Sequence, residues 1–422
     1  MTTVTSGSTA VWRNRRFRRI WLASSVSFFG SEIAELALPL LALVTLSATA
    51  QQVGFLRMAQ FLPFLVATLP LGVLVDRRRS QRLTMMVTAD LGRFLLVAAI
   101  PAAIWLGVAR IEVLYGLVFC AGILTVLYQL ADFAFLPSVV EGNQLVEANG
   151  KISASQSASE IGGRGIGGLL VQTITAPVAV AANAASFLIS GLALAGLRNQ
   201  LPSQPVDQVR PETGSGLTAG LRAAASNRYI RALLGEAATF NLFNELFILG
   251  LLVHSVHGLG LGPAEIGLVF TAGGIGSFAG AWFGSRFTAR FGYGRVLLTT
   301  LILGNTAPLG VLLAGPPGGA ALAVLSAVFV VMGVGIGIAN SHAVTLRQIA
   351  VPEQLRGRVN AAYRLVSWGV LPAGAGAGGL LATRIGAHPT MIIGAIGVTL
   401  ATAWVAFSPV PHLRRIDDAA QN

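Results

Sequence analysis

Twelve apolar segments follow one another along this chain, and basic residues gather in every second connection between them. Hydrophobic residues make up 54% of the sequence and charged residues 11%, which is far from the composition of a soluble domain. Most segments approach the ~20 residues that cross a hydrocarbon core. The pattern therefore predicts an all-α membrane protein with twelve transmembrane helices. The predicted spans are residues 20–46, 53–75, 83–107, 113–136, 153–175, 178–197, 230–253, 264–285, 296–314, 320–345, 359–383 and 389–408.

The distribution of basic residues predicts the orientation of these spans. Of the 29 Lys and Arg residues, 22 lie in the two tails or in the connections that follow even-numbered spans, and five lie within spans. Only Arg110 and Arg384 lie in the opposite connections. Because basic residues near span ends are retained on the cytoplasmic side, we expect both termini in the cytoplasm. We expect a multi-pass protein of an inner or plasma membrane.

Several other protein classes are disfavoured by the sequence. The net charge of +12 is spread over the connections with little aromatic interleaving, so anionic lipid explains it better than nucleic acid does. No Walker A loop, HExxH or GxSxG motif occurs in the chain. The single cysteine, Cys120, excludes an intrachain disulfide and a Cys-based metal cluster. We therefore expect a protein that is not an enzyme, with no cofactor, no metal and no nucleic-acid partner.

The chain is predicted to contain two helical bundles joined by a linker. Residues 1–200 form the expected N-terminal six-helix bundle, and residues 229–422 form the expected C-terminal one. Residues 201–228 are rich in Pro, Ser, Gln and charge, which is typical of a linker. The arginine pattern places this linker in the cytoplasm.

An internal repeat supports this division. Asn149 and the Gly-Gly-Leu-Leu of residues 167–170 recur 211 residues later, as Asn360 and residues 378–381. A chain of two parallel six-helix repeats is expected to hold its substrate cavity at the interface between them and to work by alternating access. Glycines at intervals of four in the eighth span, residues 276, 280 and 284, predict close helix packing.

The connection between the second and third spans resembles a signature of the major facilitator superfamily. It reads Leu-Pro-Phe at 62–64 and Leu-Pro-Leu-Gly-Val-Leu-Val-Asp-Arg-Arg-Arg at 69–79, followed by Arg82 and by Ala-Asp-Leu-Gly-Arg at 89–93. Residues 145–149 and 351–359 resemble related family segments. The likeness covers residues 17 to 410 and is greatest to exporters of drugs, macrolides and siderophores of the enterobactin type. It implies the fold of that superfamily.

In the family that this chain resembles, the loop stabilises the outward-facing state and gates the transition. Gly72 would permit close helix contact, and Asp76 would serve as an N-cap or as an acceptor for arginines across the halves. Alternatively, the arginines only set topology. Asp90 and Arg93, spaced i, i+3, predict a structural pair beside the gate. The candidate cytoplasmic gate comprises Gly72, Asp76, Arg77, Arg78, Arg79, Arg82, Asp90 and Arg93.

Two positions depart from the pattern of proton-antiport exporters. Those proteins show a GPxxGG motif in the fifth span, whereas this chain has Arg164 where Pro is expected. Many relatives also carry an acid directly after the glycine of the first span, whereas Ser31 separates Gly30 from Glu32 here. Both differences count against a standard exchange of protons for drug.

Seven acids fall within the predicted spans, where each ionised side chain costs roughly 2.5–3.5 kcal/mol. A proton carrier must be buried and must lack a permanent cation beside it, so that it can take up a proton near neutral pH. The candidates for proton coupling are Glu32, Glu35, Asp132 and Glu245. The other three acids are Asp90, Glu160 and Glu236.

Polar residues in the fourth, fifth and seventh spans are candidates for the substrate cavity. Glu160 and Arg164, spaced i, i+4, predict an ion pair within one helix. Alternatively, Arg164 faces the cavity and attracts an anion. The candidate cavity residues are Tyr128, Gln129, Glu160, Arg164, Asn241 and Asn244.

These features together predict a secondary active transporter. We expect proton-coupled efflux, by antiport, of amphipathic small molecules such as drugs, macrolides or siderophore-like metabolites. One alternative is a uniporter or symporter of an organic anion that uses Arg164. The other is a non-transporting membrane receptor or assembly protein. The expected partners are a small-molecule substrate, protons and the lipid bilayer, and the chain is expected to be a monomer.

Overall fold

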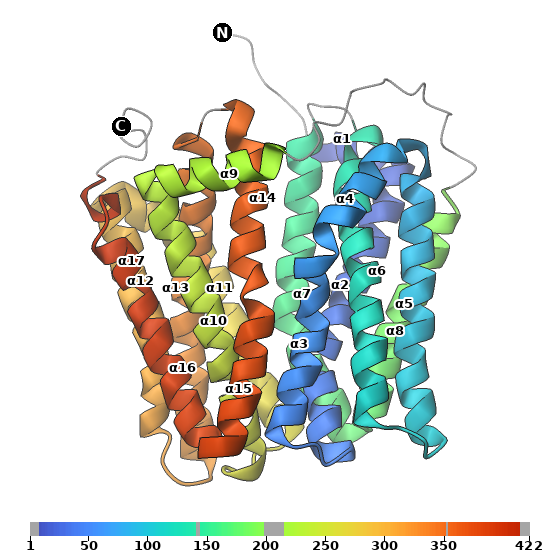
Figure 1. The fold of residues 1–422 in the computed structure, drawn as a ribbon, viewed down its shortest axis with the longest axis vertical. Helices are drawn as coiled ribbons and strands as arrows, with labels where there is room; N and C mark the ends of the chain where they lie inside the picture. The colour runs from blue at the N-terminus through green and yellow to red at the C-terminus, as the bar shows by residue number, and fades with distance from the viewer. Residues whose placement is uncertain (1–7, 141–143, 198–214, 352, 414–422) are drawn as a thin grey trace. The chain divides into compact units, whose positions relative to one another are not determined.

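The structure, a computed structural model, describes residues 8–140, 144–197, 215–351 and 353–413, and nearly all of them lie in helices. Most of the predicted linker, residues 201–214, lies outside the described residues. The rest of that segment contains a helix, α9, which in Figure 1 runs across the N-terminal end of α10. Its Gly220 lies against the backbone of Arg358.

Contacts divide the chain into two compact units. The described residues up to 41 and from 66 to 197 belong to the first unit. Its helices are α1 (Ser8–Arg13), α2 (Arg15–Leu40), α4 (Thr68–Arg77), α5 (Arg82–Trp105), α6 (Ile111–Phe135), α7 (Leu145–Thr173) and α8 (Ala176–Ala195).

The second unit contains residues 42–65 and the described residues from 215 onward. Helix α3 therefore belongs to it, although it is encoded in the first half of the chain. The helices are α3 (Ala50–Val66), α9 (Ser215–Ser226), α10 (Arg228–His257), α11 (Pro263–Phe291), α12 (Tyr293–Thr306), α13 (Gly319–Ile349), α14 (Glu353–Gly369), α15 (Leu371–Ile385), α16 (Ala387–Ala401) and α17 (Ala403–Ala406).

Ten helical segments among the described residues are long and apolar enough to cross a membrane. Helices α3 and α4 pass the same test together, as one span that bends where they meet. Helix α7 does not belong to this set, because polar residues and glycines interrupt its apolar stretch. The structure thus supports a multi-span helical membrane protein with ten or eleven apolar spans, against the twelve that the sequence predicts.

Helix α2 of the first unit and helix α10 of the second begin in the same way. The side chain of Asn14 accepts hydrogen bonds from two backbone N–H groups of α2, and that of Asn227 does the same for α10. Each asparagine also donates from Nδ2 to a distant carbonyl, that of Val139 at 2.8 Å and that of Ala350 at 3.0 Å. Because a free helix terminus leaves donors unsatisfied, the shared arrangement fixes both helix starts and agrees with an internal duplication.

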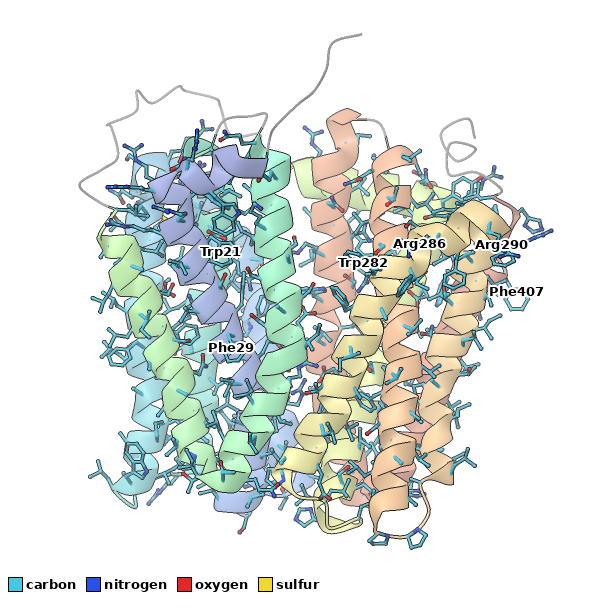
Figure 2. The ribbon with its side chains drawn as sticks, turned by 180° about the vertical axis from the view of Figure 1, so that it is seen from behind. Trp21, Phe29, Trp282, Arg286, Arg290 and Phe407 are labelled. Carbon is cyan, nitrogen blue, oxygen red and sulfur yellow. The ribbon has the colours of Figure 1, made fainter. Side chains whose placement is uncertain are left out.

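Glycine brings α11 and α13 into backbone contact, as the spacing predicts. A Cβ atom at Gly276 or Gly280 would overlap the backbone of α13 at Val330 or Val334. On the facing helix, Gly337 has the same relation to Ser277. The side chains of Trp282, Arg286 and Arg290 lie on the exposed surface of α11 instead, as Figure 2 shows.

We predict that Gly280→Ala destabilises the protein by about 1–3 kcal/mol, because the added methyl group forces two packed helices apart. Thermal unfolding of the purified protein in detergent measures this. Gly116→Ala on α6 is the control: a Cβ there meets no atom within 4 Å. We expect the control to be neutral or stabilising by about 0.5–1 kcal/mol, since alanine favours helix over glycine. Equal losses in both variants would contradict the packing argument.

Candidate functional site

Asp90 and Arg93 form an ion pair inside the first unit, as their spacing predicts. Both side chains are buried. Ser190 of α8 donates to the second oxygen of Asp90 at 2.6 Å. The guanidinium carbon of Arg93 lies 4.5 Å from the ring centre of Tyr128 and 4.2 Å from that of Phe187. A charge enclosed in this way by a carboxylate and two aromatic faces holds α5, α6 and α8 together.

Tyr128 and Asp132 lie beside this ion pair on α6. Tyr128 is buried and its hydroxyl lies 3.4 Å from Ser24 Oγ of α2. Its aromatic face covers Arg93, and the place of Tyr128 in a substrate cavity stays a prediction. Asp132 differs, because its Oδ1 is buried and has no hydrogen-bond partner among the described residues. A buried acceptor without a partner is costly and requires a functional explanation.

Glu32 of α2 pairs with Arg164 of α7. Arg164 donates from Nε to Glu32 Oε2 at 2.9 Å, and the two side chains are 34% and 21% exposed. The sequence pattern favoured Glu160 as the partner of Arg164, yet Glu160 is exposed. The premise that Glu32 lacks a permanent cation is therefore wrong. Two helices distant in sequence are joined by this pair.

Glu245 of α10 pairs with Arg57 of α3 in the second unit. Arg57 donates from Nε to Oε2 at 2.9 Å and from Nη2 to Oε1 at 3.1 Å, and each side chain is only 6% exposed. Two parallel hydrogen bonds between guanidinium and carboxylate fix both position and orientation. For Glu245, too, the premise of a missing cation is wrong. The two residues are 188 positions apart, so local spacing gives no signal of their contact.

Glu32 and Glu245 occupy equivalent positions in the two units. Glu32 lies on α2 and packs its Cβ against Gly163 of α7. Glu245 lies on α10 and packs its Cβ against Gly374 of α15. The two glycines are separated by the same 211 positions as the repeated sequence motif. The internal repeat thus places two carboxylates alike, while the arginines that neutralise them come from non-equivalent helices.

Glu236 of α10 is an acid that the sequence reasoning did not select. Asn305 of α12 donates from Nδ2 to Glu236 Oε1 at 3.2 Å and to Thr402 Oγ1 at 3.0 Å. No ion pair joins Glu236 to any described Arg or Lys. Its place in an apolar span was visible in the sequence. Its lack of a cation became clear only from the packing of α10 against α12 and α16.

The candidate gate residues lie on α4 and at the start of α5, in the first unit. Asp76 is exposed and its Oδ1 lies 3.9 Å from Arg82 Nη2, while Arg82 Nη1 donates to the carbonyl of Ala134 at 2.8 Å. Asp76 lies in the last turn of α4, so it is no N-cap. A Cβ at Gly72 would meet no atom of the described residues within 4 Å, and its role in close helix contact stays a prediction. The neighbouring Arg77, Arg78 and Arg79 are exposed.

The remaining candidate residues are half-buried. Asn241 donates to the carbonyl of Ser367 at 2.6 Å and so ties α10 to α14. Asn244 has a buried Oδ1 without a hydrogen-bond partner among the described residues. Glu35 lies one turn from Glu32 on α2, and Gln129 follows Tyr128 on α6. Their roles in transport stay predictions.

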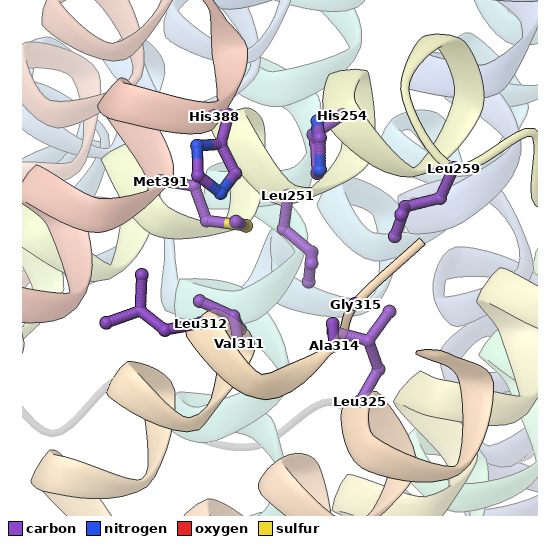
Figure 3. A pocket seen from close by; sticks show the side chains of 10 residues that line it. All are labelled: Leu251, His254, Leu259, Val311, Leu312, Ala314, Gly315, Leu325, His388 and Met391. Atoms are coloured by element: carbon purple, nitrogen blue, oxygen red, sulfur yellow. The ribbon is translucent and has the colours of Figure 1, made fainter. Parts of the chain in front are cut away.

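A small cavity of about 180 Å³ lies at the end of α10 in the second unit. Figure 3 shows His254 and His388 side by side on its wall, with ring centres 4.9 Å apart. Most of the other lining residues are apolar, among them Leu251, Leu325 and Met391. Because its volume is below the usual 300–1,000 Å³ of ligand sites, this cavity is too small for a drug-sized substrate.

Long apolar helices that carry neutralised charges are typical of membrane transport proteins, and the comparisons agree. The sequence profile described as "transmembrane secretion effector" matches residues 6–422. The chain therefore belongs to this family of the major facilitator superfamily.

Named relatives and solved structures are also of transporters. The chain is 28% identical over 417 residues to the "Multidrug efflux pump Tap" of Mycolicibacterium fortuitum, covering 95% of this chain and 97% of that one. It is 27% identical to the protein of that name in Mycobacterium tuberculosis H37Rv, covering 95% of each. A bacterial homologue of the iron transporter ferroportin superposes with a TM-score of 0.66 at 18% identity, covering 93% and 98%. The nucleoside transporter NupG (D323A mutant) gives 0.72 at 13%, covering 93% and 99%.

We predict that Glu245→Gln lowers the free energy of unfolding by about 3–5 kcal/mol, because Arg57 would remain buried without a counter-charge. Replacing both residues by Met should restore much of this stability, since an apolar pair of similar volume carries no desolvation penalty. Thermal unfolding in detergent gives the comparison.

Glu147→Gln is the matched control for this test, since the Glu147–Lys151 pair of α7 is partly exposed. We expect a change of only about 0–1 kcal/mol there. An unfolding temperature of Glu245→Gln equal to that of the wild type would show that the buried pair does not stabilise the fold.

Proposed function

We propose that this protein exports amphipathic small molecules, such as drugs, across a bacterial cell membrane in exchange for protons. The names of the Tap relatives support drug efflux. In this proposal α7 also crosses the membrane, which brings the total to twelve crossings. Both termini lie in the cytoplasm, and one chain suffices for transport. The arginine distribution supports that orientation. Residues 1–200 and 229–422 are the two halves that alternate, with the segment between them as a cytoplasmic linker.

The observation that carries proton coupling is the contrast between paired and unpaired acids. Glu32, Asp90 and Glu245 each have an arginine partner. Asp132 and Glu236 form no ion pair with any described residue. Because an ionised carboxylate without a partner is costly in hydrocarbon, these two groups have to bind a proton or a cationic substrate. If a proton and a cationic substrate bind these carboxylates in turn, the protein exchanges one for the other, which is antiport.

The paired acids have a different role in this proposal. Arginines of other helices neutralise Glu32 and Glu245, so these two acids hold the scaffold while protons move elsewhere. The anion-transport alternative is not favoured, because the guanidinium of Arg164 already binds Glu32. An organic anion would have to displace that carboxylate first. No contact in the structure favours a non-transporting receptor.

We predict that Asp132→Asn and Glu236→Gln each abolish substrate-dependent proton release from everted vesicles, because an amide cannot carry the proton. A fluorescent pH indicator inside acidified vesicles measures the release when a cationic dye is added. Glu147→Gln, which changes an acid on α7, should behave as the wild type. Full proton release by the Asp132→Asn/Glu236→Gln double variant, at normal expression, would refute the assignment.

Helix α3 is the element whose contacts we expect to change during transport. It is encoded before α4 of the first unit but packs on the second, where Arg57 binds Glu245 and Gly54 lies against Gly379. The backbone N–H of Gln51 also donates to Thr383 Oγ1 at 3.0 Å. We infer that α3 leaves α15 during the transport cycle, since alternating access moves one half of the chain against the other.

A disulfide between residues 51 and 383 tests this inference. We predict that the Gln51→Cys/Thr383→Cys variant, in a Cys120→Ser background, stops transporting a cationic dye when oxidised. Activity should return on reduction, because the cross-link prevents α3 from separating. The two single-cysteine variants, treated with the same oxidant, serve as controls. Undiminished transport by fully cross-linked protein would mean that α3 and α15 stay together throughout the cycle.

A further inference from the structure

A second pocket of about 390 Å³ lies in the second unit, where α10 begins and α17 ends. Its volume falls within the 300–1,000 Å³ that is typical of ligand sites. Arg228 and Arg231 of α10 line one side, and Trp404 and Phe407 line the other. None of the described residues that line it is acidic.

The two arginines of this pocket have no carboxylate partner among the described residues. Arg228 contacts the hydroxyl of Tyr229, at 3.5 Å, and the ring of that residue. Arg231 donates to the carbonyl of Ala225 at a long 3.4 Å. Neither guanidinium forms an ion pair with a carboxylate among the described residues. Two uncompensated guanidinium groups on the rim of one pocket favour an anionic ligand with several oxygen acceptors.

The aromatic side of the pocket is fixed in place and faces outward. The indole ring of Trp404 lies against Gly235 of α10, and its Nε1 donates to Thr239 Oγ1 at 3.0 Å. Phe407 is 93% exposed, and Figure 2 shows it projecting from the edge of its unit. In a membrane protein such exposed aromatic rings lie at the level of headgroups and upper acyl chains.

We propose that this pocket binds an anionic phospholipid. Arg228 and Arg231 bind the phosphate of the headgroup, and Trp404 and Phe407 contact the glycerol and the upper acyl chains. Charge and apolar surface occur side by side here, as they do in a phospholipid, whereas a free phosphate would use only the arginines. Basic pockets beside membrane helices are known to hold such headgroups. The bound lipid would join the start of α10 to α17.

Native mass spectrometry of the full chain in detergent tests the proposal, with phosphatidylglycerol and phosphatidylcholine of the same acyl chains as probes. We expect tighter binding of phosphatidylglycerol by the wild type. Binding should weaken about fivefold in Arg231→Gln and about 25-fold in Arg228→Gln/Arg231→Gln. Arg228→Lys/Arg231→Lys should keep most of the affinity.

Arg286→Gln/Arg290→Gln is the matched control, because it removes two exposed, aromatic-stacked arginines of α11 that do not line the pocket. We expect its affinity to equal that of the wild type, and we expect millimolar inorganic phosphate not to displace the lipid. Equal affinity in wild type and Arg231→Gln, or an equal loss in the control pair, would overturn the site. Displacement by phosphate would overturn the lipid as its ligand. None of these outcomes depends on proton coupling.

Discussion

A charge inside a bilayer needs a counter-charge, and this requirement governs the structure of the chain. Helix α2 of the first unit carries Glu32, and helix α10 of the second carries Glu245. Each glutamate is neutralised by an arginine from another helix. Because one partner alone would be left ionised in a low dielectric, these pairs specify which helices meet. The close approach that they require is provided by glycine, at Gly163 in one unit and Gly374 in the other.

The same requirement separates scaffold from mechanism. Arginine-bound carboxylates cannot readily exchange protons while their partners remain, so Glu32, Asp90 and Glu245 are suited to holding helices. Asp132 and Glu236 are not held in this way: Asp132 lies beside the Asp90–Arg93 pair without joining it, and Glu236 accepts a hydrogen bond from the amide of Asn305. We assign coupling to them for that reason. The second unit also contains α3 from the first half, so a conformational change has a defined contact to break, the one between α3 and α15.

Local patterns in the sequence were sufficient for features with local causes. The helical character, the close glycine packing of α11 and the Asp90–Arg93 pair follow from composition and from spacings of three and four residues. Partners brought together by tertiary packing were not predictable in this way. The i, i+4 spacing favoured Glu160 for Arg164, but the observed partner is Glu32, 132 residues away. Likewise, nothing near Glu236 in the sequence reveals that its neighbour is an amide.

Reconstitution of the purified chain into liposomes gives the most direct test of coupling. With a pH dye inside and no other energy source, an imposed gradient of a cationic drug should drive protons in the opposite direction, and an ionophore that dissipates the resulting pH difference should speed drug movement. This result would establish exchange of one for the other. Drug flux that leaves the internal pH unchanged, and that ignores an imposed pH gradient, would contradict the account.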